Sequence, residues 1–329
     1  MSEPVLTNRV TQPAARGGPA NWLPRPEKGG KIAVKFRWLR GRWLNAVLIL
    51  LTLASTTVFG FAADLSFRQG RGLDDEDILN GYRLLFHGSS EVWTGLAYSL
   101  PLLLILLFHE FGHCFLCRRW SVRATLPYFA PSPTLLGTLG AFISIRSPIY
   151  RRRALFDIGI SGPIAGFAAL TPFLLAGVWK SRVCPGAGTH GVFSFGAPAL
   201  LRLAEAWRFP GVASHNICLH PMAIAAWAGL LATAINLLPV GQLDGGHILY
   251  ATWGARGHAL LSRVTVGLLA LAGFFYWPWC IWAIGMFFLR RHPLTYDAEP
   301  LGRLRWFLAA VAVLLFLLSF SIVPVRLGS

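Results

Sequence analysis

The stretch that decides the fold spans residues 106–117 and reads L-L-F-H-E-F-G-H-C-F-L-C. It closes an apolar run that begins near residue 92 and is long enough to cross a bilayer as a helix. Because residues four apart lie on one face of a helix, His109 and His113 can bind a single metal ion, with Glu110 beside them. Ionisable groups at membrane depth cost about 2.5–3.5 kcal/mol each, and a bound metal would compensate for this cost.

A second polar stretch closes another apolar run far along the chain. Residues 236–247 read N-L-L-P-V-G-Q-L-D-G-G-H. Asp244 would supply a third ligand and leave a fourth coordination position for water, which is typical of catalytic rather than structural zinc sites. The two stretches therefore predict one zinc ion. The alternative is a chance match to a short pattern, with the histidines facing a polar crevice.

The composition is that of an integral membrane protein. Of 329 residues, 54% are hydrophobic, and the 13 Trp and 23 Phe make the chain too apolar for an ordinary soluble domain. The net charge of +16 would suit nucleic acid, but most of the basic residues are arginines that flank apolar runs, as positive-inside topology requires. We therefore expect the lipid bilayer as a partner, and no nucleic acid.

The apolar runs predict an all-α polytopic membrane protein with about six to seven transmembrane segments. The runs cover residues 43–65, 92–117, 155–179, 221–240, 264–276, 277–289 and 304–323. The two short runs, broken at Pro278, would form a helical hairpin or one re-entrant element. The arginine clusters at 118–119 and 151–153 predict a cytoplasmic N-terminus and place the histidine motif near the cytoplasmic face. We expect the membrane to be the bacterial cytoplasmic membrane.

The segment between the second and third runs differs from a span. Its prolines are followed by the β-rich T-L-G-A-F-I-S-I-R of residues 138–146, which predicts a small membrane-associated β-hairpin. A bare strand edge is not tolerated in lipid, so protein must cover the hairpin or it must line a wet cavity. It is either a plain connection or an edge near Phe142 that captures an extended substrate by β-augmentation.

The third run opens with F-D-I-G-I-S-G-P-I-A-G-F at residues 156–167. Asp157 is expected in the first turn of its helix, where the helix dipole favours a carboxylate. Gly162 permits close helix approach and Pro163 frees a backbone carbonyl, so this stretch is either a tight packing surface or the wall of a cleft beside the metal.

The loop after the third run is predicted to lie outside. Cys184 and Cys218 bracket it, and a disulfide is permitted there, although the sequence leaves the pairing open. Residues 199–207, A-L-L-R-L-A-E-A-W, predict an amphipathic helix along the surface. Cys114 and Cys117 form a lone C-x-x-C in the motif helix, for which packing is favoured over a zinc or redox role.

Together, the two motifs resemble the site-2 protease family of intramembrane zinc metalloproteases. H-E-F-G-H at residues 109–113 looks like its H-E-x-x-H, and residues 236–246 look like its N-x-x-P-x-x-x-L-D-G. Residues 137–149 and 156–166 are similar to a branch without a PDZ domain that is found in archaea, many bacteria and plastids. The resemblance covers about residues 92–292.

The resemblance implies a zinc metalloendopeptidase that hydrolyses peptide bonds within or near the transmembrane helices of single-span membrane proteins. It implies that His109, His113 and Asp244 hold the zinc and that Glu110 is the base. Candidate contacts to the substrate or oxyanion are Asn236, Phe142, Gly162 and Pro163. Other branches carry an asparagine shortly after the Gly-Pro pair, where this chain has Gly166, so no polar catalytic role is expected on that helix.

With this resemblance the chain divides into four parts. They are a flexible basic cytoplasmic tail (1–42), a first span with an outer acidic loop (43–91), a metalloprotease membrane core (92–292) and a C-terminal span (293–329).

Three other functions fit parts of the pattern. A membrane metal transporter would use the same His/Asp cluster for translocation, but transporters often show internal repeats and the histidine motif has no second copy. A catalytically silent scaffold or chaperone would not need an intact Glu110. Zinc proteases of other membrane families usually take a glutamate as third ligand, where this chain offers Asp244.

Overall fold

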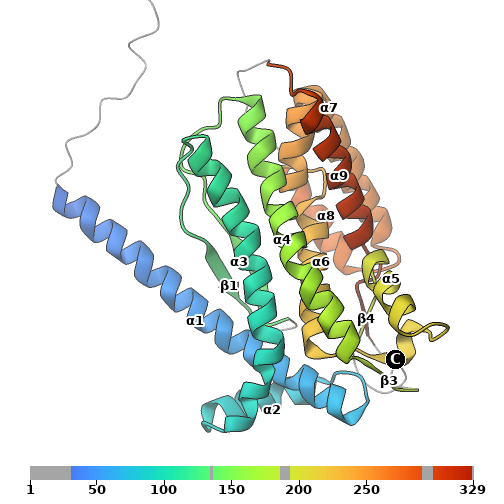
Figure 1. Ribbon diagram of the computed structural model, residues 1–329. Helices are drawn as coiled ribbons and strands as arrows, with labels where there is room; N and C mark the ends of the chain where they lie inside the picture. The colour runs from blue at the N-terminus through green and yellow to red at the C-terminus, as the bar shows by residue number, and fades with distance from the viewer. Residues whose placement is uncertain (1–30, 134–135, 186–192, 291–298, 328–329) are drawn as a thin grey trace, which may run out of the picture. The chain divides into compact units, whose positions relative to one another are not determined.

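The computed structural model describes residues 31–133, 136–185, 193–290 and 299–327 (Figure 1). The chain divides into two units, Met1–Arg42 and Trp43–Ser329. Helix α1 (Lys31–Gln69) begins in the first unit, within the segment predicted as a flexible tail, and its residues from Trp43 onward belong to the second. All other elements lie in the second unit.

Helix α4 (Arg152–Lys180) lies at the centre of a helical bundle. It packs against α3 (Leu96–Arg119), α6 (Pro221–Asn236), α7 (Asp244–Ala272) and α9 (Arg303–Ser319) (Figure 1). Gly177 lets α4 and α6 approach closely, because a Cβ there would lie 2.3 Å from the backbone nitrogen of Ala223. This packing fixes the relative depth of the two motif-bearing parts of the chain.

Three helical stretches are long and apolar enough to cross a membrane: Trp43–Gln69, Ser90–Arg119 and Arg152–Lys180. Helices α6 and α8 (Pro278–Leu289) are apolar but shorter. The predicted spans at 92–117 and 155–179 agree with these helices within a few residues. The expectation of a mostly helical membrane protein with a small β-hairpin is confirmed.

The remaining elements are short. The helices are α2 (Asp75–Phe86), η1 (Ser90–Gly95), α5 (Ala199–Arg208) and η3 (Ser214–Asn216). The strands are β1 (Tyr128–Pro131), β2 (Thr138–Phe142), β3 (Arg182–Val183), β4 (Phe193–Phe195), β5 (Ile217–Cys218) and β6 (Val325–Leu327). They form three antiparallel pairs, β1–β2, β3–β5 and β4–β6.

The predicted hairpin consists of β1 and β2, and side chains of two helices hold the residues before β1 and between the strands. Asn45 of α1 donates to the Pro127 carbonyl at 3.1 Å, and Ser55 of α1 donates to the Gly137 carbonyl at 2.6 Å. Tyr98 of α3 donates to the Leu136 carbonyl at 3.0 Å. The tip of the hairpin is therefore held between two of the spanning helices.

The C-terminal half of the bundle differs from the two short predicted runs. Residues 264–276 mostly belong to α7, which begins twenty residues earlier than the run, at Asp244, and is interrupted at Gly254, where φ is +72°. Helix α8 then packs back against α7, so the two form a helical hairpin rather than one re-entrant element.

Two further expectations change at the ends of helices. The acidic loop forms the start of α2, where the Asp77 carboxylate accepts the backbone N–H of Asp74 at 3.4 Å and pairs with Arg71 at 2.7 Å. Asp157 is not in the first turn of α4, because that helix begins at Arg152.

The predicted amphipathic helix is α5, and Cys184 and Cys218 form a disulfide that joins β3 to β5.

Candidate metal centre

Helix α3 presents two imidazoles on one face, as the H-E-x-x-H spacing requires. His109 and His113 are 6% and 5% exposed, and their Nε2 atoms lie 3.2 Å apart. The rings are close to perpendicular, with centroids 4.9 Å apart. Both Nε2 atoms therefore face a common point.

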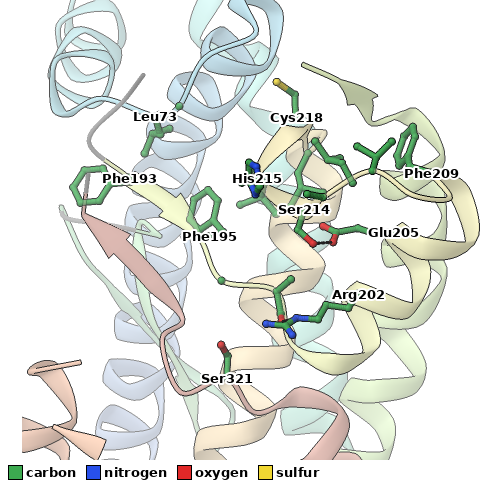
Figure 2. A pocket seen from close by; sticks show the side chains of 18 of the residues that line it. Leu73, Phe193, Phe195, Arg202, Glu205, Phe209, Ser214, His215, Cys218 and Ser321 are labelled. Atoms are coloured by element: carbon green, nitrogen blue, oxygen red, sulfur yellow. Dashed lines mark hydrogen bonds between the residues drawn. The ribbon is translucent and has the colours of Figure 1, made fainter. Parts of the chain in front are cut away.

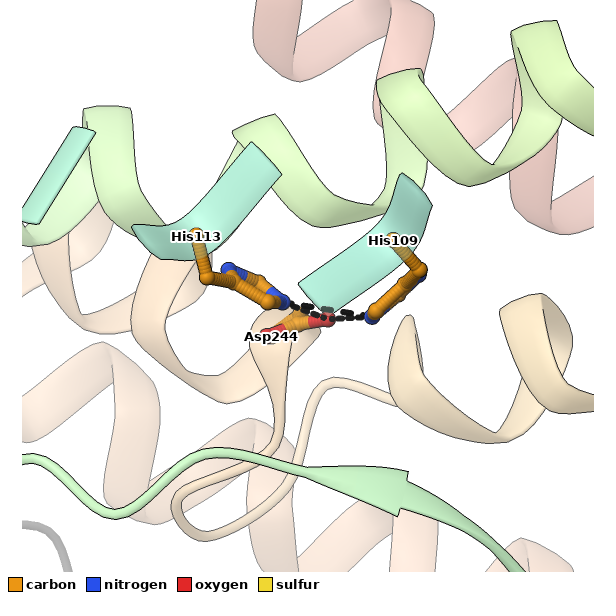
Figure 3. A group of neighbouring side chains, drawn as sticks. All are labelled: His109, His113 and Asp244. Atoms are coloured by element: carbon orange, nitrogen blue, oxygen red, sulfur yellow. Dashed lines mark hydrogen bonds and ion pairs between the residues drawn. The ribbon is translucent and has the colours of Figure 1, made fainter. Parts of the chain in front are cut away.

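A tight turn after α6 brings the third member. Helix α6 ends at Asn236, and α7 begins with Asp244. Gly241, with a φ of +60°, and Gly245, where a Cβ would lie 2.1 Å from the Leu237 carbonyl oxygen, allow the chain to fold back so closely. Asp244 consequently points at the face of α3 that carries the histidines (Figure 3).

The three groups have the spacing of a zinc site. Asp244 Oδ2 lies 3.2 Å from His109 Nε2 and 3.3 Å from His113 Nε2. Ligand atoms about 2.0–2.1 Å from a tetrahedral zinc ion lie about 3.3 Å from one another. Asp244 Oδ2 is buried, and its contacts among the described residues are to these two imidazole nitrogens, which leaves the oxygen free to bind a cation. Two imidazole nitrogens and one carboxylate oxygen therefore fit a single zinc ion, and three ligands leave a fourth position.

Helix α4 forms the wall behind the histidines. His113 Nδ1 lies 2.8 Å from the Ile158 carbonyl oxygen, which can only accept a hydrogen bond, so Nδ1 carries the proton and Nε2 is free to bind metal. A Cβ at Gly162 would lie 2.1 Å from His113 Nε2, and one at Gly166 would lie 3.1 Å from His109 Nδ1. These glycines therefore let α4 pack tightly against both imidazoles, as the packing interpretation of this stretch predicts.

Glu110 is buried on α3, next to His109 in the chain. Its side chain is 4% exposed, and the backbone N–H of Ile143, the residue after β2, interacts with its carboxylate. The hairpin therefore reaches the centre by its backbone.

The other candidate contacts occupy different places. Asn236 lies at the edge of the cluster, with its Nδ2 3.3 Å from His109 Nε2. Phe142 is 56% exposed, and its ring lies 5.8 Å from that of Tyr128, so it lines the hairpin surface outside the cluster. Pro163 is buried in α4 beside Gly162.

Sequence reasoning missed two participants, the Ile158 carbonyl and the Ile143 amide. Both are backbone groups, so the residue type at these positions does not predict their roles. The only available signal for the first was its position within the glycine-rich start of the third apolar run.

Comparison with known proteins agrees with this geometry. Residues 97–277 match the model of peptidase family M50. The chain belongs to that family. The matched range contains both histidines, Glu110, the hairpin and Asp244, so the resemblance to site-2 proteases is confirmed. Membership of M50 does not favour a metal transporter.

Several plant proteins are similar to the M50 part of the chain. A probable chloroplastic zinc metalloprotease, EGY2 of Arabidopsis thaliana, is 32% identical over 213 residues, 63% of this chain and 37% of its own length. EGY2 of Oryza sativa subsp. indica is also 32% identical, over 64% of this chain and 39% of its own length. EGY1 of Arabidopsis thaliana is 30% identical over 297 residues, 85% of this chain and 52% of its own length. The chain thus spans 37–52% of the length of these relatives.

Proposed function

We propose that this protein is an intramembrane zinc metalloendopeptidase that hydrolyses peptide bonds within or near the transmembrane helices of single-span membrane proteins. One observation carries the proposal. Ligand atoms of two histidines and one aspartate, from helices far apart in sequence, lie within 4.8 Å of one another inside an apolar helical bundle.

The proposed zinc ligands are His109, His113 and Asp244. Zinc held by these residues would supply Lewis-acid chemistry: it would lower the pKa of a water molecule to about 7 and polarise a carbonyl oxygen. The Ile158 carbonyl keeps the His113 ring in the tautomer that this role needs.

Glu110 is proposed as the general base. It follows His109 directly, and its burial keeps bulk water away from the carboxylate. The carboxylate takes a proton from the attacking water and later passes it to the leaving amine. The backbone of Ile143 lies close enough to interact with the same carboxylate. Asn236, at the edge of the cluster, is placed to donate a hydrogen bond to the substrate carbonyl as charge develops on it.

The hairpin suggests how a substrate is presented. The carbonyl groups of a transmembrane helix are closed in i to i+4 hydrogen bonds, so the substrate must unwind before a peptide bond can react. Strand β2 ends at Phe142, one residue before the amide that meets Glu110. A substrate segment added to the β2 edge would therefore be extended and close to the base.

The protein is an integral membrane protein, and we propose that its N-terminus and its zinc centre lie toward the cytoplasm. Arg118 and Arg119 end α3 one to two turns after the second histidine, and Arg151 precedes α4. Such clusters are retained on the cytoplasmic side. We propose that the protein resides in the bacterial cytoplasmic membrane.

The test is cleavage of single-span test proteins by the purified chain. Glu110→Gln should fold and retain zinc but lose about 100- to 10,000-fold in rate, the usual contribution of general acid–base catalysis. Glu91→Gln, at an exposed position in η1, is the matched control and should cleave normally. Unimpaired cleavage by Glu110→Gln would refute the proposed mechanism.

A further inference from the structure

The far end of α4 carries a surface that the proposed protease chemistry does not use. There α5 packs against α4, and the two helices enclose an apolar crevice of about 280 Å³. Its lining is largely aliphatic and includes Leu174, Leu175, Leu200 and Leu203, with Trp207 at one end. Leu175 and Leu203 are 50% and 61% exposed, so the crevice is open to its surroundings.

Aromatic and basic side chains gather at the end of this crevice. The Trp179 and Trp207 rings have centroids 6.2 Å apart, and both rings are more than 60% exposed. The Arg208 guanidinium lies 5.0 Å from the centre of the Trp179 ring and 4.9 Å from that of Phe209. Lys180, the last residue of α4, is also exposed. Tryptophans at the end of a spanning helix are typical of the membrane–water interface.

The guanidinium of Arg208 is available for a ligand. Among the described residues it has no hydrogen bond or ion pair, and its Nε is buried under the rings without a partner. Stacking on two rings holds the group in place and leaves its terminal nitrogens for an anion. A planar guanidinium binds phosphate oxygens through paired N–H groups.

The two faces of α5 differ in their charged side chains. The opposite face lines a cavity of about 820 Å³, into which Arg202 and Glu205 project (Figure 2). The Arg202 Nε donates to the Ala197 carbonyl at 2.8 Å, and Glu205 accepts from Ser214. The positive charge of Arg208 therefore lies at the end of the apolar crevice, whereas the Glu205 carboxylate lies in the cavity on the opposite face of α5.

We propose that the α4–α5 crevice and Arg208 form a binding site for an anionic phospholipid. One acyl chain occupies the crevice beside Leu175 and Leu203, and the phosphate contacts Arg208 at the level of the Trp179–Trp207 pair. A lipid is favoured over a free phosphate ion because an acyl chain can occupy the apolar crevice next to Arg208. This site does not depend on the zinc centre.

The experiment measures lipid binding by native mass spectrometry, using full-length protein that carries Glu110→Gln so that proteolysis does not interfere. Phosphatidylglycerol and phosphatidylcholine of equal chain length are titrated separately. The parent protein should bind phosphatidylglycerol more tightly. Arg208→Gln should weaken phosphatidylglycerol binding about fivefold, which corresponds to about 1 kcal/mol for one cation at the lipid surface, and should leave phosphatidylcholine binding almost unchanged. Arg202→Gln, on the opposite face of the helix, should behave like the parent.

Further arms separate the possible sources of an effect. Leu203→Gln should weaken both lipids, because it makes the crevice polar. If Arg208→Gln does not fold, Arg208→Lys should retain part of the preference, since it keeps the charge but loses the planar fork. Equal binding of the two lipids by the parent, or equal losses in the Arg208 and Arg202 variants, would overturn the proposal. Displacement of the lipid by millimolar inorganic phosphate would also overturn it, because the site would then be a free-anion site.

Discussion

The Asp157 carboxylate forms a two-point ion pair with the Arg305 guanidinium, 148 residues away in sequence. The Arg305 Nε–Asp157 Oδ1 and Nη2–Oδ2 distances are both 2.7 Å, and Trp120 Nε1 donates to the same carboxylate at 3.2 Å. The pair ties α9, which lies outside the M50 match, to α4. The next residue of α4, Ile158, holds His113 through its carbonyl, so the pair also supports the metal centre.

Breaking this pair should destabilise the protein and weaken zinc binding. Arg305→Gln should lower the free energy of unfolding by about 1.5–3 kcal/mol, because it removes charged hydrogen bonds that are largely shielded from water. Arg153→Gln is the control, since Arg153 pairs with Glu299 at an exposed position and such pairs contribute about 0–1 kcal/mol. Denaturant unfolding and zinc titration measure the two effects. Equal stability losses in the two variants would contradict this role of Asp157.

Gly162→Ala should impair the zinc centre directly. The new Cβ would lie 2.1 Å from His113 Nε2, so either the ring or α4 must move. We expect zinc affinity to fall by at least about tenfold, as when supporting contacts of a ligand are lost. Gly267→Ala, where a Cβ meets nothing within 4 Å, should keep full affinity and gain up to about 1 kcal/mol of stability from helix propensity. A competitive zinc chelator gives both affinities.

Glu205 should make stability depend on pH. Burial raises the pKa of its carboxyl group, although hydrogen bonding to Ser214 and the charge of Arg202 oppose the shift. Because the folded-state pKa exceeds that of the unfolded chain, the protonated form is favoured in the native state. Its stabilising contribution is complete below the unfolded pKa of about 4.5 and is lost as pH rises through the folded value.

Replacing this residue isolates the effect. Glu205→Gln should raise the midpoint of thermal unfolding at pH 7 relative to the native protein, and the difference should shrink toward pH 4.5. The Gln oxygen can still accept from Ser214, so the hydrogen bond is retained. A difference that stays constant over this pH range would show that ionisation of Glu205 is not its cause.

The disulfide between Cys184 and Cys218 should stabilise the end of the bundle remote from the zinc. Its loss in Cys184→Ser/Cys218→Ser should reduce the free energy of unfolding by about 2–4 kcal/mol, as expected for a closed loop of this length. Cys280→Ser, at an exposed free thiol, is the control. Urea unfolding under non-reducing conditions measures both, and a double variant as stable as the control would contradict the expectation.

The parts of the fold that follow from composition could be predicted from the sequence. Helices α3 and α4 have ends set by arginines beside long apolar runs, and these were located within a few residues. The sequence does not predict the start of α7, because D-G-G indicates a turn, whereas the helix begins there through the close approach of Gly245 to Leu237. The sequence does not predict α2, because a cluster of acidic residues between apolar runs indicates an outer loop rather than the first turn of a helix.

The sequence could predict those residues of the site that act through their side chains. His109, His113 and Asp244 carry metal chemistry in their residue types and spacing, and the structure brings them together. The groups that contact these residues have no such signal in the sequence. Ile158 and Ile143 act through backbone groups, and Arg305 is remote in sequence. Their roles are visible only once α4 is packed against α3 and α9.

The decisive measurement is the zinc content of the purified protein and of its Asp244→Ala variant. We predict about one zinc per chain in the native protein and a large loss in the variant, with Glu91→Gln, at an exposed position in η1, as a control that removes a carboxylate charge outside the ligand set. An Asp244→Ala variant that holds zinc as stoichiometrically as the native chain would contradict the convergence of the two motifs on one ion.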